Sequence, residues 1–140
     1  MIVKKNNYSW MYVEKRKTKI TITLPKLTAL EHSGNSNVSV SGITGNLFKL
    51  DQSGNGNITI EGNTMLFDLL KSGNGDIRAS KFIAKEIKIV TSGNGDCIIH
   101  ATDKIIARGS GNGDVINTGE ADFDADSSKT GNGKLIKRKN

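Results

Sequence analysis

Three aspartates near the C-terminal end of the chain, Asp122, Asp124 and Asp126, alternate with Phe123 and Ala125. If this segment is an extended strand, the three carboxylates project from one face. Such a face could bind a cation, or it could supply the paired carboxylates of a polysaccharide-cleaving β-helix enzyme. Those enzymes also need a precisely placed base and a groove built by large loops, for which the segments here are too short. We expect a solvated strand face and no catalytic residue, with the three aspartates as the candidate metal ligands.

A second set of aspartates, Asp76, Asp96 and Asp114, occupies one position of a repeated motif in which earlier copies carry Asn37 and Asn57. Carboxylate and amide oxygens suit calcium. However, the nonapeptide Gly-Gly-x-Gly-x-Asp period of calcium-binding β-rolls is absent. We therefore expect these side chains to cap turns, with calcium binding as the alternative.

The remaining reactive side chains are His32, His100 and Cys97. A single cysteine forms neither a disulfide within the chain nor a cysteine-cluster metal site. Cys97 falls in an apolar column of the repeat, so we expect a small core residue. Two isolated histidines define no triad and no two-histidine metal site, and we expect no cofactor.

The motif Ser-Gly-Asn-Gly-Asp recurs along the whole chain, and the repeated elements around it determine where these residues lie. Copies begin at residues 33, 53, 72, 92, 110 and 130, so they are separated by 20, 19, 20, 18 and 20 residues. A constant period of this size is typical of a solenoid. Eleven of the 16 glycines lie in the six copies, which indicates tight turns and not flexible linkers.

Aligning the copies shows which positions face inward. Apolar residues fill the column five residues after the start of the motif, which comprises Val38, Ile58, Ile77, Cys97, Val115 and Leu135. Similar columns precede the motif by three residues, from Leu30 to Ala107, and by five residues, from Phe48 to Ala125. Each repeat thus predicts two short strands around the motif and a variable corner opposite. A propeller blade would need about 40 residues, so we predict an all-β parallel β-helix of about six coils of 18–20 residues.

Stacked coils would bring the asparagines of the motif to one position in successive turns. Side-chain amides at that spacing can hydrogen-bond along the stack. The predicted structural ladder consists of Asn35, Asn55, Asn74, Asn94, Asn112 and Asn132.

The ends of the chain differ from the repeats. Residues 1–26 contain two alternating segments, around Tyr8–Tyr12 and Ile20–Leu24, with a basic run between them, and predict an N-terminal β cap (a hairpin) or an incomplete first coil. Residues 27–140 form the repeat body. The net charge of +6 comes from the two ends, since residues 27–128 hold eight basic and thirteen acidic residues. No basic stripe follows the repeats, so we expect no nucleic-acid partner.

One outward column turns apolar toward the C-terminal end. Ser39, Thr59 and Arg78 are followed at the same position by Ile98, Ile116 and Ile136. An exposed apolar stripe needs a covering segment or a partner. The three isoleucines are therefore a candidate subunit interface for a homo-oligomer.

The succession of Ser-Gly-Asn-Gly-Asp-Ile blocks, preceded by Ile20-Thr-Ile-Thr-Leu-Pro25-Lys-Leu27, resembles the head GIN domain family of bacterial auto-transporter adhesins. The resemblance spans roughly residues 18–136. It implies a right-handed β-helix, an adhesive role and a cell-envelope or extracellular location. The chain lacks a recognisable export signal and any stretch of apolar residues long enough for a membrane span.

Together these features predict a non-enzymatic β-helix scaffold or adhesion-type binding module for a protein or glycan surface. A structural protein that self-assembles laterally is the alternative. A carbohydrate-active enzyme is the third hypothesis.

Overall fold

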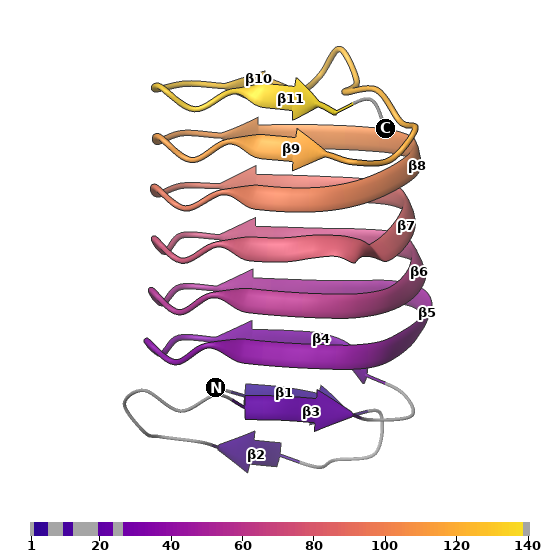
Figure 1. The fold of residues 1–140 in the computed structure, drawn as a ribbon, viewed down its shortest axis with the longest axis vertical. Helices are drawn as coiled ribbons and strands as arrows, with labels where there is room; N and C mark the ends of the chain where they lie inside the picture. Colours follow the sequence, from indigo (N-terminus) through magenta and orange to yellow (C-terminus); the bar gives the residue numbers. More distant parts are fainter. Residues whose placement is uncertain (1, 6–9, 13–19, 24–26, 139–140) are drawn as a thin grey trace.

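The computed structural model describes residues 2–5, 10–12, 20–23 and 27–138, with side chains described for residues 27–138 (Figure 1). Within these ranges all regular structure is β-strand, and the strands form a parallel β-solenoid of about five turns. Nowhere in the same ranges is there a helix long and apolar enough to cross a membrane. The six motif copies mark six corners, which bound five complete turns. The predicted all-β parallel β-helix is confirmed.

The described strands, in chain order, are β1 (Ile2–Lys5), β2 (Trp10–Tyr12), β3 (Ile20–Thr23), β4 (Leu27–His32), β5 (Val38–Gln52), β6 (Ile58–Lys71), β7 (Ile77–Thr91), β8 (Cys97–Gly109), β9 (Val115–Asn117), β10 (Ser128–Lys129) and β11 (Leu135–Lys137). From β4 to β9, and again between β9 and β11, neighbouring strands pair in parallel.

Each central coil consists of one tight turn and one long strand. From the turn, β5 to β8 run along a front sheet, curve around the opposite side and return along a back sheet (Figure 1). Two short strands per coil are expected from the sequence, but the strand continues through the variable corner. In β5 and β6 glycines lie at this bend, where Gly42 (φ 76°) and Gly62 (φ 141°) have positive φ. The pairing register shifts by one residue there and keeps the new offset along the back sheet, so the corner absorbs the difference in length between successive coils.

The core lies between the two sheets. The predicted inward columns are buried from Val38 to Val115. Phe82 meets Phe48 and Phe67 edge-on, with ring centroids 5.4 and 5.1 Å apart. The C-terminal ends of the columns differ from expectation, because Ala125 is exposed and Leu135 is only half-buried. In the described part of the chain, no further coil covers them.

The N-terminal strands join both sheets. β1 pairs antiparallel with β2 and with β4, whereas β3 pairs in parallel with β5, placing Ile20 beside Val38 and Ile22 beside Val40. The two segments of the expected hairpin therefore pair, where they are described, with different strands. The alternating isoleucines of β3 match the register of the front-sheet columns, which favours stacking over a hairpin. The basic run at residues 15–19 lies outside the described residues.

The glycines of the motif allow successive turns to stack at strand spacing. A Cβ on Gly73 would collide with the carbonyl oxygen of Gly54 in the preceding turn. A Cβ on Gly34, in the first copy, would instead make only ordinary van der Waals contacts, the nearest with the His32 ring at 3.6 Å. Glycine is thus required by the close approach of two backbones.

We expect Gly73→Ala to lower the free energy of unfolding by about 1–3 kcal/mol, because the added methyl group forces two backbone turns apart. The matched control Gly34→Ala should be neutral or stabilising by up to about 1 kcal/mol, since alanine restricts the unfolded chain. Urea unfolding followed by circular dichroism measures both. Equal losses in the two variants would contradict the stacking explanation.

Candidate functional site

An uninterrupted ladder of hydrogen bonds joins the motif asparagines on the exposed side of the turns. Each Nδ2 donates to Oδ1 of the asparagine one turn earlier, at 2.8–3.1 Å. The amide is suited to this column because it carries a donor and an acceptor on one flat group. The ladder contains Asn35, Asn55, Asn74, Asn94, Asn112 and Asn132.

A second column, two residues further on, caps the backbone of the next turn. Oδ1 of Asp76 accepts from the N–H of Asp96 at 3.1 Å, and Oδ1 of Asp96 accepts from the N–H of Asp114 at 2.8 Å. Asn37 and Asn57 accept in the same way in the earlier turns. The position therefore requires an acceptor oxygen, which asparagine and aspartate both supply. Among the residues the structure describes, no three histidine, cysteine, aspartate or glutamate side chains are grouped to hold a metal.

A polar column lies inside the solenoid immediately before the turns. Lys71, only 1% exposed, donates from Nζ to the Gly73 carbonyl at 2.7 Å, and Gln52 donates from Nε2 to the Gly56 carbonyl. These side chains satisfy carbonyl groups that the tight turns direct inward. This column was not predicted from the sequence. The sequence indicates the column only through spacing. Gln52 and Lys71 follow Leu50 and Leu69 by two residues, so on a strand their side chains face inward as the leucines do.

Burial shifts the titration of three side chains in this interior. It lowers the pKa of Lys71 and of His32, and it raises the pKa of the Cys97 thiol to about 12. Cys97 therefore stays protonated and packs in the core. Nε2 of the His32 ring lies 3.4 Å from the Ser36 hydroxyl, while Nδ1 has no hydrogen-bond partner among the described residues.

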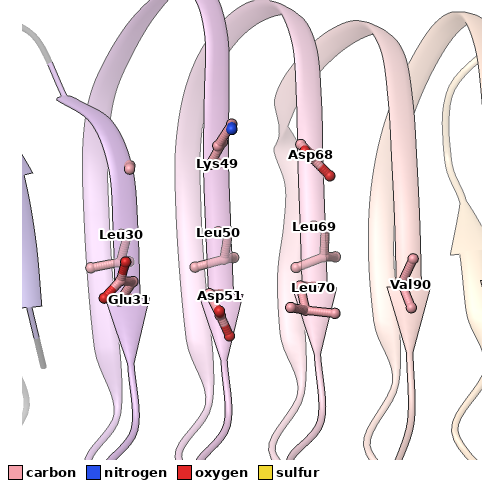
Figure 2. A pocket seen from close by; sticks show the side chains of 10 residues that line it. Leu30, Glu31, Lys49, Leu50, Asp51, Asp68, Leu69, Leu70 and Val90 are labelled. Carbon is pink, nitrogen blue, oxygen red and sulfur yellow. The ribbon is translucent and has the colours of Figure 1, made fainter.

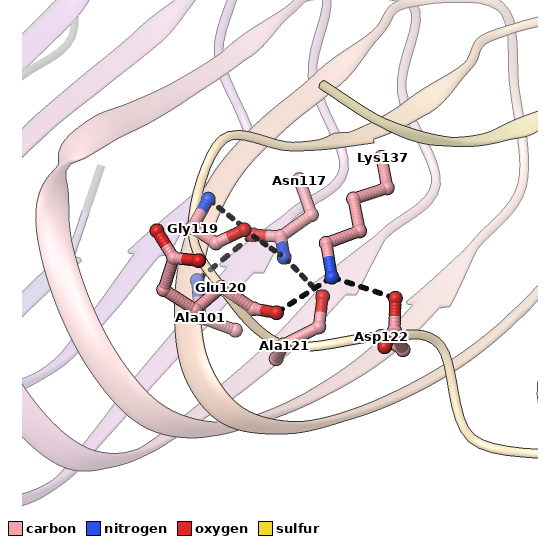
Figure 3. A network of polar contacts seen from close by, with 7 residues as sticks. All are labelled: Ala101, Asn117, Gly119, Glu120, Ala121, Asp122 and Lys137. Carbon is pink, nitrogen blue, oxygen red and sulfur yellow. Dashed lines mark hydrogen bonds and ion pairs between the residues drawn. The ribbon is translucent and has the colours of Figure 1, made fainter. Parts of the chain in front are cut away.

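The C-terminal aspartates do not share a strand face, and that expectation is wrong. Phe123 forms an isolated bridge with Ile105, and residues 125–126 form a turn. The Asp126 N–H donates to Asp124 Oδ1 at 3.0 Å, and this bond, with Lys104 nearby, lowers the pKa of Asp124. Each of two carboxylates thus interacts with a lysine of its own chain, Asp124 with Lys104 at 3.5 Å and Asp122 with Lys137 at 2.7 Å (Figure 3).

The hydrogen bonds of the buried Asn117 side chain explain why the chain turns after β9. Its Oδ1 accepts from the N–H groups of Ala101 and Gly119, and its Nδ2 donates to the carbonyls of Gly119 and Ala121, at 2.7–3.2 Å (Figure 3). This side chain ties residues 119–121 to β8. An asparagine in an otherwise apolar inward column marks the end of the regular coils.

The isoleucine stripe lies on the front sheet. Ile116 pairs in register with Ile98 on one side and Ile136 on the other. Ile98 and Ile136 are half-buried, and Ile116 is only 6% exposed although it lies outside the core cluster. The three side chains thus expose little apolar area that a partner could contact.

The opposite surface, the outer side of the back sheet, is here called the back face. It carries three outward columns in register. Nearest the corner is the column of Leu47, Leu66, Glu86 and Lys104. The other two are the Asp68 column (Ala29, Lys49, Asp68, Lys88, Ile106) and the Leu70 column (Glu31, Asp51, Leu70, Val90, Arg108). Leu70 and Val90 adjoin and are 46% and 53% exposed. A shallow hollow of about 460 Å³ lies along the N-terminal half of this face, lined partly by Leu70, Val90 and the acidic residues beside them (Figure 2).

These features define a class of protein: a parallel β-solenoid with ladder-bonded turns, whose variable side chains lie on its outer faces. The chain belongs to the family described as "Putative auto-transporter adhesin, head GIN domain", whose model matches residues 2–121. The match ends before the aspartates at 122, 124 and 126. No curated protein and no solved structure matches the chain.

For the capping column we expect Asp96→Asn to keep the wild-type free energy of unfolding, because the amide retains the acceptor oxygen. Asp96→Ala should lose about 0.5–1.5 kcal/mol, since the N–H of Asp114 loses its partner. Thermal melts with added calcium and with chelator should coincide. A calcium-dependent rise in the midpoint that Asp96→Asn abolishes would instead assign the column to an ion.

For the interior column we expect acid sensitivity from His32. Its pKa is lowered in the folded state, so between that value and the ordinary 6.5 the unfolded chain binds more protons. The contribution of His32 to the free energy of unfolding should therefore be constant above about pH 6.5 and fall as the pH drops through this window. Urea titrations at several pH values should show a flatter profile for His32→Gln and an unchanged profile for His100→Gln. Identical profiles for the two variants would contradict the assignment.

Proposed function

We propose that this domain is a non-enzymatic, adhesion-type binding module that engages a protein surface through its back face. The observation that carries the proposal is the pair Leu70 and Val90, exposed side by side on the back sheet and surrounded by charged side chains. An apolar centre with a polar rim is the common anatomy of a protein interface. The family description supports an adhesive role and display at the bacterial cell surface.

The composition of the back face favours a protein over a glycan as the partner. Sites for small polar ligands are concave and combine aromatic rings with a few placed polar groups. Among the described side chains, Phe48, Phe67 and Phe82 are buried in the core and Phe123 packs against it. No described aromatic ring therefore lies on the back face. The side chains of Tyr8, Trp10 and Tyr12 are outside the described part.

Three observations support a non-enzymatic role. Lysines interact with Asp122 and Asp124, which leaves these carboxylates poorly placed for acid–base catalysis. The Cys97 thiol is buried and its pKa is raised to about 12, so it is a poor nucleophile. His32 is buried against Ser36 within the solenoid.

The test is binding to an array of purified bacterial surface proteins and glycans that also includes this chain. We expect a protein ligand whose affinity falls at least tenfold with Leu70→Ser, because the substitution removes the apolar centre. The matched control Ile83→Ser should bind as wild type, since Ile83 is 47% exposed but lies in the corner opposite the turns. No binding by the wild type, or binding equally affected by both variants, would contradict the proposal. Binding confined to glycans would overturn the choice of a protein partner.

A further inference from the structure

We propose that the partner of the back face is a second copy of this chain, docked with its solenoid axis antiparallel to the first. This inference rests on the proposed function and names the partner for that same face. It comes from the order of charges along the axis.

Charge changes sign along the Leu70 column. The column begins with Glu31 and Asp51, continues with Leu70 and Val90, and ends with Arg108. A two-fold axis between the Leu70 and Val90 turns, directed along the strands, would bring this column onto itself in reverse order. Asp51 then faces Arg108 of the second copy, and Leu70 faces Val90 of the second copy. Each contact occurs twice, as in any isologous interface.

The Asp68 column obeys the same symmetry. About the same axis, Asp68 faces Lys88 of the second copy, and Lys49 faces the uncharged Ile106 of the second copy. Neither pair brings like charges together. The two columns together give four opposite-charge pairs around a centre of two leucines and two valines.

A parallel dimer lacks this complementarity. With each turn facing its own copy, Asp51 would meet Asp51 and Arg108 would meet Arg108, which opposes association. If the columns were exchanged instead, Leu70 would face Asp68 and Val90 would face Lys88. The antiparallel arrangement is thus favoured by electrostatics and by burial of the apolar pair.

The charged groups are available for these contacts. Asp51, Asp68 and Lys88 are exposed and form no ion pair within the described part of their own copy. Arg108 is exposed as well, and its Nε donates to the Asp126 carbonyl at 3.4 Å, which leaves the outer nitrogens free to bind a carboxylate.

The area of the back face determines the expected strength of self-association. The two-fold axis brings the back-sheet parts of four strands, β5 to β8, against those of the second copy. Four strands at about 4.8 Å and six residues at about 3.3 Å give a face of roughly 19 by 20 Å, or about 380 Å² per copy. A total near 760 Å² is below the size of standard specific interfaces, so we expect a weak dimer with a Kd of tens to hundreds of micromolar. Many copies on one surface would strengthen such contacts through multivalency.

Sedimentation velocity over roughly 5–500 µM tests the proposal with the full chain. Wild type should shift from monomer to dimer over this range and no further. Asp51→Lys and Arg108→Asp should each weaken self-association at least tenfold, because each places like charges opposite one another twice. An equimolar mixture of the two variants should dimerise like wild type, since every facing pair then carries opposite charges. The double variant should also dimerise.

Two variants control for net charge. Glu120→Lys and Lys85→Asp make the same changes of charge at exposed positions away from the back face, and they should dimerise like wild type. Melting curves should show all variants folded. Dimers that survive both Asp51→Lys and Arg108→Asp, or a mixture of these variants that stays monomeric, would overturn the proposal.

The result also separates this inference from the proposed function. A chain that stays monomeric at the highest concentration, yet binds another protein in a manner lost with Leu70→Ser, overturns self-recognition and leaves the binding module standing. A wild-type chain that neither dimerises nor binds another protein contradicts both proposals.

Discussion

The spacing of successive backbone turns, about 4.8 Å, is the constraint on which this structure depends. At that distance the turn glycines must lack a Cβ, as Gly73 does above the Gly54 carbonyl. The same distance lets the amide of Asn74 reach that of Asn55 at 3.0 Å. It also lets the side chain at the fifth motif position accept from the backbone of the next turn. One spacing therefore determines three positions of the motif.

The chemistry of stacking explains why the two ladders use different residues. A carboxamide is self-complementary, since its NH₂ can donate to the oxygen of an identical group. A carboxylate only accepts, so aspartates cannot bond to one another and instead accept backbone N–H groups, as Asp96 does from Asp114. Lys134 can occupy the last copy because its own N–H is capped by Asp114 and, among the described residues, no later turn needs its side chain.

Features that repeat could be predicted from the sequence, and features that occur once could not. The inward columns and the asparagine column recur in most turns, so the period alone locates them. The interior position before the turn holds His32, Gln52 and Lys71, whose types suggest solvent exposure although their spacing indicates the inside. At the C-terminal end, alternation of Asp122 and Asp124 with apolar residues is typical of a strand, but a strand also needs neighbours. Asn117 instead holds residues 119–121, just before these aspartates, in a bend.

The two outer faces differ in a way that bears on binding. On the front sheet Ile98, Ile116 and Ile136 repeat one residue, and Ile116 is buried largely between its neighbours, so this column stabilises the stack. On the back face the residue changes at every turn, and Leu70 and Val90 stay 46% and 53% exposed although they adjoin in register. This column is therefore available to a partner. Because its charges run from acidic to basic along the axis, the partner that matches it best is the same column reversed.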